Sequence, residues 1–285
     1  MPTASTLLLT ALAMLAFAGN SLLCRLALKD TAIDAASFTA VRLASGALML
    51  WLLLRLRRQP LKATGNWRAA AALFVYAAAF SYAYLQLDAG SGALLLFGAV
   101  QLCMITSGLL RGERLNSQQT LGFALALGGL LALLLPGASA PSLVGGVLML
   151  LAGLAWGVYT LLGRQAGTPL AGTAGNFIRA LPFAALLLAP FFAELRWDLP
   201  GLVYALLSGA LTSGIGYAIW YSALPGLGAL QAASVQLSVP VLAALGGNLL
   251  LGETISLRLA LVSVAVLGGI GLVFRARFKA VPQKA

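Results

Sequence analysis

Charged residues are scarce in this chain of 285 residues: 9% of the residues are charged, 61% are hydrophobic, and the mean hydropathy is +0.96. Soluble domains carry about a quarter charged residues, so the composition excludes a water-soluble protein. The apolar runs, such as 121–135, are continuous rather than alternating, which excludes a transmembrane β-barrel. The sequence therefore predicts an all-α polytopic membrane protein.

Histidine is absent, and the two cysteines, Cys24 and Cys103, both lie within apolar runs. We expect buried free thiols rather than a disulfide. We expect neither a metal site nor a cofactor, because histidine is the commonest metal ligand and the usual proton shuttle near neutral pH. The lack of a clear general base or activated nucleophile also disfavours an enzyme.

The acidic residues fall only at the ends of apolar runs or between them: Asp30, Asp34, Asp88, Glu113, Glu194, Asp198 and Glu253. No ionisable residue is expected at mid-depth of a membrane-spanning helix. Proton-driven antiporters usually keep a titrating carboxylate within the membrane. The pattern therefore favours facilitated diffusion of a substrate down its gradient, or coupling by a route that the sequence hides.

Breaks in hydropathy predict ten membrane-spanning segments, each near the length of about 20 residues that crosses a bilayer: 5–25, 35–55, 68–87, 91–110, 117–135, 143–163, 172–192, 200–221, 227–250 and 257–275. The basic residues lie mostly between these segments, where they determine topology, so the net charge of +11 does not predict nucleic-acid binding. With a cytoplasmic N-terminus, twelve Lys and Arg residues lie inside and four lie outside. We expect both termini in the cytoplasm.

The chain contains an internal repeat. Glu113 recurs 140 positions later as Glu253, and each is followed by a glycine pair, Gly128-Gly129 and Gly268-Gly269. The stretch 17–25, FAGNSLLCR, likewise resembles 156–164, WGVYTLLGR. Five helices in each unit, 1–138 and 139–285, make the second unit enter the membrane from the opposite side. Inverted repeats of this kind are typical of alternating-access transporters that bind substrate near the membrane midplane.

Aromatic and amide side chains are the polar groups left within the predicted helices. Some share a helix face, as Tyr82 with Gln86, Tyr217 with Tyr221, and Gln101 with Phe97 and Met104. They predict an uncharged cavity that hydrogen-bonds a zwitterion or stacks on an organic ring or cation. The alternative is that they hold helices together or form interfacial belts. The candidate substrate-binding residues are Asn20, Tyr82, Gln86, Gln101, Trp156, Tyr159, Tyr217, Tyr221, Gln231 and Gln236.

Other residues are interpreted as structural. Glu113 and Glu253 each close a helix, so we expect them to cap the next helix or to pair with a cation near Arg114 or Arg258. The matched residues Arg42 and Arg179 lie near the start of a helix. We expect them to pair with a helix C-terminus or a carboxylate at the membrane face, with gating of a cavity mouth as the alternative. Proline inside an apolar run, at Pro182 and Pro240, predicts a kink.

Gly112-Glu113-Arg114-Leu115 with Gly128-Gly129, and Pro240 with Gly252-Glu253 and Gly268-Gly269, resemble the motifs of the EamA-type drug/metabolite transporter superfamily over essentially the whole chain. The resemblance implies an exporter in the bacterial inner membrane, with a central cavity formed by the first, third and fourth helices of each half. The aromatic set Tyr82, Trp156 and Tyr217 is similar to that of aromatic amino acid and paraquat exporters. The first half departs from the second in having no proline that matches Pro240.

The resulting expectation is a monomeric carrier in the lipid bilayer that exports small metabolites, above all neutral or aromatic amino acids, by alternating access. One alternative is a carrier of nucleotide sugars or other anions, which would require cations facing the cavity. A carrier of drugs or other metabolites and a channel are further alternatives. A non-transporting membrane protein such as a lipid-handling enzyme is the alternative from a different class.

Overall fold

The computed structural model describes residues 3–59, 65–112, 114–137, 140–163, 169–192, 195–227, 232 and 234–279, without the side chains of 191 and 275–279. Every regular element among these residues is a helix. The helices of the first half are α1 (Ala4–Asp30), α2 (Ala35–Leu56), α3 (Trp67–Tyr84), α4 (Ala89–Leu110) and α5 (Ser117–Leu134). Those of the second half are α6 (Leu143–Gly163), α7 (Pro169–Leu188) with the short η1 (Ala189–Phe191), α8 (Leu199–Leu206), η2 (Leu207–Ile215), α9 (Gly216–Ala223), η3 (Leu224–Gly226), α11 (Ser238–Leu251) and α12 (Leu257–Lys279).

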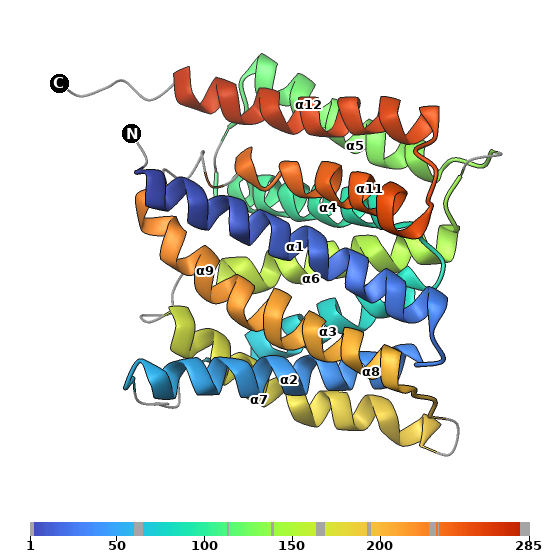
Figure 1. The fold of residues 1–285 in the computed structure, drawn as a ribbon. Coiled ribbons are helices and arrows are strands. Elements are labelled where there is room, and N and C mark those ends of the chain that lie inside the picture. Colours follow the sequence, from blue (N-terminus) through green and yellow to red (C-terminus); the bar gives the residue numbers. More distant parts are fainter. Residues whose placement is uncertain are drawn as a thin grey trace.

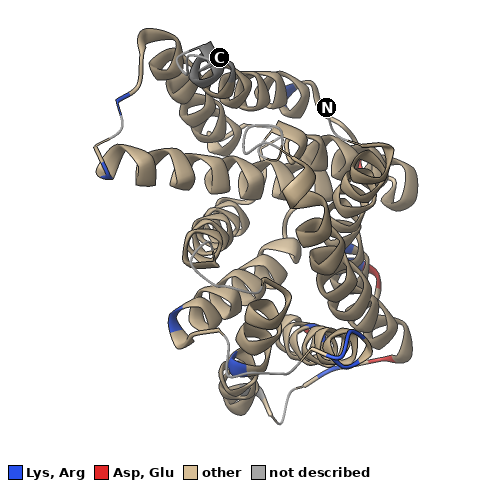
Figure 2. Cartoon of the chain, turned by 90° about the vertical axis from the view of Figure 1, so that its left-hand side faces the viewer, with Lys and Arg blue, Asp and Glu red and all other residues tan. Residues whose placement is uncertain are grey.

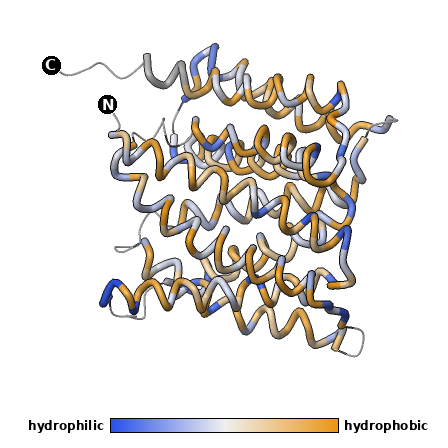
Figure 3. The backbone as a smooth tube through the Cα atoms, in the orientation of Figure 1, coloured by the Kyte–Doolittle hydropathy of each residue, from blue (hydrophilic) through white to orange (hydrophobic). Residues whose placement is uncertain are grey.

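The predicted all-α membrane fold is confirmed. Among the described residues, eight helical segments are long and apolar enough to cross a membrane, and Leu199–Gly226 counts as one of them. Helices α3 and α11 run alongside these segments in the same bundle (Figure 1). Hydrophobic residues occupy the lengths of the helices, and hydrophilic residues gather toward the ends (Figure 3). The helix axes therefore run across the membrane.

The packing of the helices follows a two-fold pattern. Helices α2, α4 and α5 pack on their counterparts in the other half, which are α7, α11 and α12. Other contacts occur in matched pairs: α6 packs on α3 as α1 packs on α9, and α6 packs on α4 as α1 packs on α11. Figure 1 shows these pairs stacked in layers, with α1 beginning and α12 ending at the same end of the bundle.

Short polar side chains start most of the helices. The N-cap residues Thr3, Asp34, Asn66, Asn116 and Asp198 each accept a hydrogen bond from a backbone N–H of the first turn, which satisfies groups that a helix leaves unpaired. The sequence-based boundaries differ most in the segment 227–250. There α11 begins only at Ser238, so Pro240 lies in its first turn, where proline removes no intrahelical bond and starts the helix instead of bending it.

In each glycine pair, one glycine packs against the neighbouring helix and the other does not. A Cβ atom on Gly269 of α12 would lie 2.5 Å from the carbonyl oxygen of Gly122 on α5, and one on Gly129 would lie 2.7 Å from Val266. Added Cβ atoms at Gly128 and Gly268 would meet nothing within 4 Å. The second glycine of each pair thus allows α5 and α12 to approach closely, as small residues do in membrane helix packing.

Gly269→Ala is expected to destabilise the fold by about 1–3 kcal/mol, because the new methyl group meets the backbone of α5. The neighbouring Gly268→Ala is the matched control; it is expected to leave stability unchanged or raise it by up to about 1 kcal/mol, since alanine favours the helix. Unfolding of both variants in detergent, followed by circular dichroism, measures the difference. Equal stability of the two variants would contradict the assigned packing.

Candidate functional site

A cavity of about 560 Å³ lies between the two halves. Its wall extends to the end of the bundle where α1 begins, where Gly163, Pro169, Leu224 and Leu227 line it. The deeper wall comes from α1, α3, α4, α6, α7, η2 and α9. Five of the six helices that the family resemblance implied therefore line the cavity, since η2 and α9 belong to the predicted segment 200–221. The sixth, 227–250, contributes Ala232 and Gln236 ahead of α11, and α7 adds Gly172, Thr173 and Asn176. The lining residues in the described part of the chain include no Asp, Glu, Lys or Arg.

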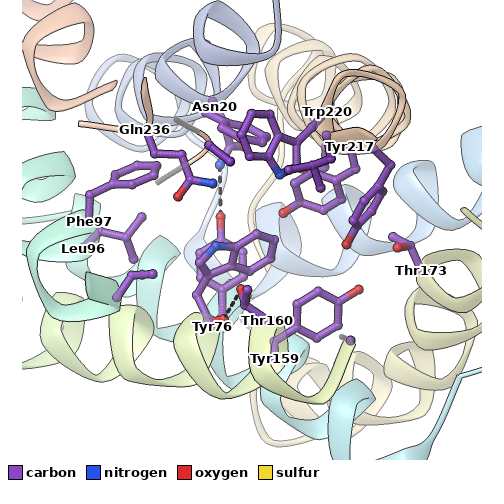
Figure 4. A pocket seen from close by; sticks show the side chains of 18 of the residues that line it. Asn20, Tyr76, Leu96, Phe97, Tyr159, Thr160, Thr173, Tyr217, Trp220 and Gln236 are labelled. Carbon is purple, nitrogen blue, oxygen red and sulfur yellow. Dashed lines mark hydrogen bonds between the residues drawn. The ribbon is translucent and has the colours of Figure 1, made fainter. Parts of the chain in front are cut away.

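Aromatic rings form one side of the cavity, with Trp156 of α6 at their centre. The ring centroid of Trp156 lies 4.8 Å from that of Tyr76, 5.1 Å from Tyr159 and 5.2 Å from Tyr217. Phe17 of α1 packs edge-on against Tyr217 and Trp220. Figure 4 shows Tyr159, Tyr217 and Trp220 across the cavity from Leu96 and Phe97 of α4. Such a wall offers a flat apolar surface with polar edges, suited to stacking on a planar ligand.

A hydrogen-bonded chain of buried polar groups crosses the inner part of the wall. The amide Nδ2 of Asn20 donates to the hydroxyl of Tyr76 at 3.3 Å (Figure 4), and Asn20 Oδ1 accepts from Ser208 at 2.8 Å and from Thr212 at 3.3 Å. Ser208 and Thr212 belong to η2, a π-helical stretch of nine residues. The π-helical turns place both hydroxyls against Asn20 of α1. Such turns are rare and often occur at functional sites.

Arg42 lies directly behind this wall and is the main departure from the sequence analysis. Its side chain is 2% exposed, and its guanidinium carbon lies 5.1 Å from the ring centroid of Tyr76 and 4.8 Å from that of Phe80. Arg42 Nη2 donates to the Tyr76 hydroxyl at 2.8 Å. The expected pairing of Arg42 with a helix C-terminus or a carboxylate at the membrane face is therefore wrong, because the cation is buried against two aromatic rings and a hydroxyl. Arg179, its sequence match, is half-buried and donates to Gly175 O of its own helix.

The cavity contains seven of the ten candidate residues from the sequence: Asn20, Gln101, Trp156, Tyr159, Tyr217, Tyr221 and Gln236. Tyr82 and Gln86 do not line it; Gln86 accepts a hydrogen bond from Ser142 at the other end of the bundle. Gln231 lies outside the described residues. The sequence analysis missed the lining residues Tyr76, Phe80, Thr173, Asn176 and Trp220. Tyr76 and Phe80 are also four residues apart on α3, a signal as strong as the Tyr82–Gln86 pair.

The end of the bundle that the cavity wall reaches, where α1 begins, is called the cavity mouth below. At the opposite end, Arg25 of α1 forms two ion pairs. Arg25 Nε pairs with Glu253 Oε1 at 3.0 Å, and its Nη2 pairs with Asp88 at 3.3 Å. Glu253 Oε2 accepts from the backbone N–H of Ala89, the first residue of α4, at 2.8 Å. The expected pairing of Glu253 with a cation is confirmed, but its partner is Arg25. Arg258 instead donates to Ala132 O and Leu135 O at the end of α5, and Glu113 lies outside the described residues.

At this same end, the loop before α2 and the loop before α8 link the two halves through hydrogen bonds. The carboxylate of Asp34 accepts from Ser37 N and from the backbone N–H of Arg196, each at 2.8 Å. Asp198 accepts from Ala32 N at 3.3 Å in the reverse direction. Burial alone would raise the pKa of Asp34, but these hydrogen bonds stabilise its charged form and hold its pKa below the usual value.

The two ends of the bundle differ in charge. The end with the cavity mouth carries exposed arginines at helix termini and in loops, as Figure 2 shows in a view of that end: Arg55, Arg57, Arg58, Arg68, Arg111 and Arg114. The acidic residues that the structure describes all lie at the opposite end: Asp30, Asp34, Asp88, Asp198 and Glu253. Within the described residues, no cluster of three or more His, Cys, Asp or Glu is placed to bind a metal ion.

Comparisons with known proteins agree with this arrangement. The model of the EamA-like transporter family matches the chain twice, at residues 4–135 and 143–275. The chain is 73% identical to an uncharacterized protein of Pseudomonas aeruginosa over 97% of each chain. It is 28% identical to an uncharacterized transporter of Archaeoglobus fulgidus over 94% of this chain and 96% of that protein. A solved crystal structure with 18% identity superposes on 99% of this chain, and over its own full length, with a TM-score of 0.67, which shows the same fold.

Glu253→Ala is expected to destabilise the protein by about 3–5 kcal/mol, because it leaves the nearly buried Arg25 and the start of α4 without their partner. The side chains of Arg25 and Glu253 are 12% and 7% exposed. Asp88→Asn is the control: its side chain is 55% exposed, so the loss is expected to be about 0–1 kcal/mol. Denaturant titration in micelles measures both, and a larger loss for Asp88→Asn would contradict the assignment.

Proposed function

The chain belongs to the EamA-like transporter family, and from this premise we propose that it exports small amphipathic metabolites that carry an aromatic or other planar group. Aromatic and neutral amino acids are the first class to examine. The transported compound would occupy the cavity between the two halves and be stacked on the rings around Trp156. The protein would work by alternating access in the bacterial inner membrane, as a monomer.

The observation that carries the proposal is the cavity itself. Its volume of about 560 Å³ falls within the range of about 300–1,000 Å³ that is typical of small-molecule sites. Aromatic side chains from α1, α3, α4, α6 and α9 line its deeper wall, together with amide groups such as those of Asn20, Gln101 and Gln236. A few polar groups in an otherwise apolar wall orient an amphipathic ligand and admit more than one compound.

The direction of access follows from the charges at the two ends. Lys and Arg are enriched on the cytoplasmic side of membrane proteins, so we assign the arginine-rich end, which the cavity wall reaches, to the cytoplasm. The opposite end is sealed by Arg25, Asp88 and Glu253. Export would then require Arg25 to separate from Glu253 while the cytoplasmic mouth closes, in the rocking of one half against the other that inverted repeats permit.

The described residues of the cavity wall include no Asp or Glu. The wall therefore offers no carboxylate that could couple export to the movement of protons. We propose that the substrate moves down its own gradient. A nucleotide sugar is a weaker candidate, because its two phosphates require several facing cations.

Counterflow of radiolabelled tryptophan, phenylalanine, tyrosine and leucine into proteoliposomes is expected to be saturable and unaffected by an imposed pH gradient. Trp156→Ala is expected to raise the half-saturating concentration about tenfold for the aromatic compounds, because it removes the central stacking surface. Tyr82→Phe is the matched control, since Tyr82 does not line the cavity. Absence of uptake across this panel would refute amino acids as substrates, and a requirement for the gradient would refute uncoupled transport.

Accessibility of the cavity tests its proposed orientation. In a variant that lacks Cys24 and Cys103, Thr160→Cys in the cavity wall, at a partly exposed position, is expected to react with a membrane-impermeant thiol reagent in inside-out vesicles much faster than in right-side-out vesicles. Thr39→Cys is the control that should resist in both, because Thr39 is 0% exposed and bonded to Ser81. The reverse preference would show that the mouth faces outward.

A further inference from the structure

The positive charge of Arg42 lacks a balancing negative charge. The ion pairs within the described residues both involve Arg25, and neither involves Arg42. Its Nη1 is buried without a hydrogen-bond partner among the described residues, and its guanidinium lies over the faces of Tyr76 and Phe80. Ionisable side chains within membrane helices are costly and are usually paired, so one that is not paired points to a functional site.

The donors around Arg42 are directed toward the cavity. The Tyr76 hydroxyl accepts from both Arg42 Nη2 and Asn20 Nδ2, so its own proton is left for another acceptor. Tyr76 lines the cavity. The hydroxyl of Ser213, also in the wall, is buried without a partner within the described residues. Arg42 polarises the Tyr76 hydroxyl through their hydrogen bond, which strengthens it as a donor.

From these observations we propose that the transported compound is an organic anion: its carboxylate binds beside Tyr76 and Ser213 under the charge of Arg42, and its planar group stacks on Trp156. This assignment rests on the proposed transport function and names the substrate class of the same cavity. The carboxylate of the bound compound would balance the positive charge of Arg42.

The chemistry of the wall separates this class from its neighbours. A single cation matches one carboxylate, whereas phosphate groups are usually held by several cations or bidentate arginines. The ammonium of a cationic amine would meet a positive field and find no carboxylate among the described lining residues. An aromatic amino acid satisfies the anion subsite with its carboxylate alone, so an aromatic acid without an ammonium group is the better fit.

Three indole compounds of similar size test the charge: indole-3-acetate, its neutral amide indole-3-acetamide, and the cation tryptamine. Competition against counterflow in proteoliposomes is expected to rank them in that order for the wild-type protein. Arg42→Met is expected to weaken indole-3-acetate about tenfold or more, as loss of a charge-assisted bond does, and to leave indole-3-acetamide unchanged. Arg179→Met, at the matched position of the second half, is the control and is expected to behave as wild type.

The readouts also separate a binding role from a structural one. Arg42→Lys keeps the charge and is expected to retain part of the preference for the acid, while Tyr76→Phe, which removes only the hydroxyl, is expected to lose it. Equal weakening of the acid and the amide in Arg42→Met, or a wild-type preference for tryptamine, would overturn the anion subsite. Either result leaves the transport function standing, provided that wild-type protein moves members of the amino acid panel. If indole-3-acetate does not raise the melting temperature of detergent-solubilised wild type, the subsite is also refuted.

Discussion

The hydroxyl of Tyr76 joins three helices, since it belongs to α3 and accepts from Asn20 on α1 and Arg42 on α2. In the apolar interior of a membrane protein, a polar side chain without a partner is costly, so these bonds fix the position of the ring. Trp156 packs on that ring, and Tyr159 and Tyr217 pack on Trp156. The aromatic wall of the cavity thus depends on one hydroxyl that is held from two sides.

The two halves share a packing scheme but differ where the cavity forms. Helix α3 is a regular α-helix, whereas its counterpart contains the π-helical η2, which places Ser208 and Thr212 against Asn20. Helix α4 is continuous over 22 residues, while α11 begins at Ser238 and spans 14. Differences of this kind let one end of an inverted repeat open while the other is sealed, and here the sealed end is the one that holds Arg25 and Glu253.

The sequence predicted the helical fold and most of the cavity, because hydropathy and the repeat depend on residue type alone. It selected Tyr82 of α3 and Gln86 just beyond that helix, whereas the cavity is lined by Tyr76 and Phe80. A helix surrounded by lipid and by other helices is apolar on all sides, so its polar residues do not mark the inner face. It placed Arg42 at the membrane face, because burial of a cation depends on the rings of Tyr76 and Phe80 from a distant part of the chain. The π-helical stretch had no recognisable signal in the sequence.

Arginine suits the position behind the cavity better than lysine would. Its planar guanidinium lies over two aromatic faces while one nitrogen donates to Tyr76, a combination that the compact ammonium of lysine does not reproduce. These contacts offset part of the cost of burying the charge but leave Nη1 without a partner in the part of the chain that the structure describes. The same rings that hold the cation also line the cavity. A negative charge in the cavity would therefore act on the same groups that set the shape of the cavity. The charge of the bound compound would in this way affect the positions of α1, α2 and α3.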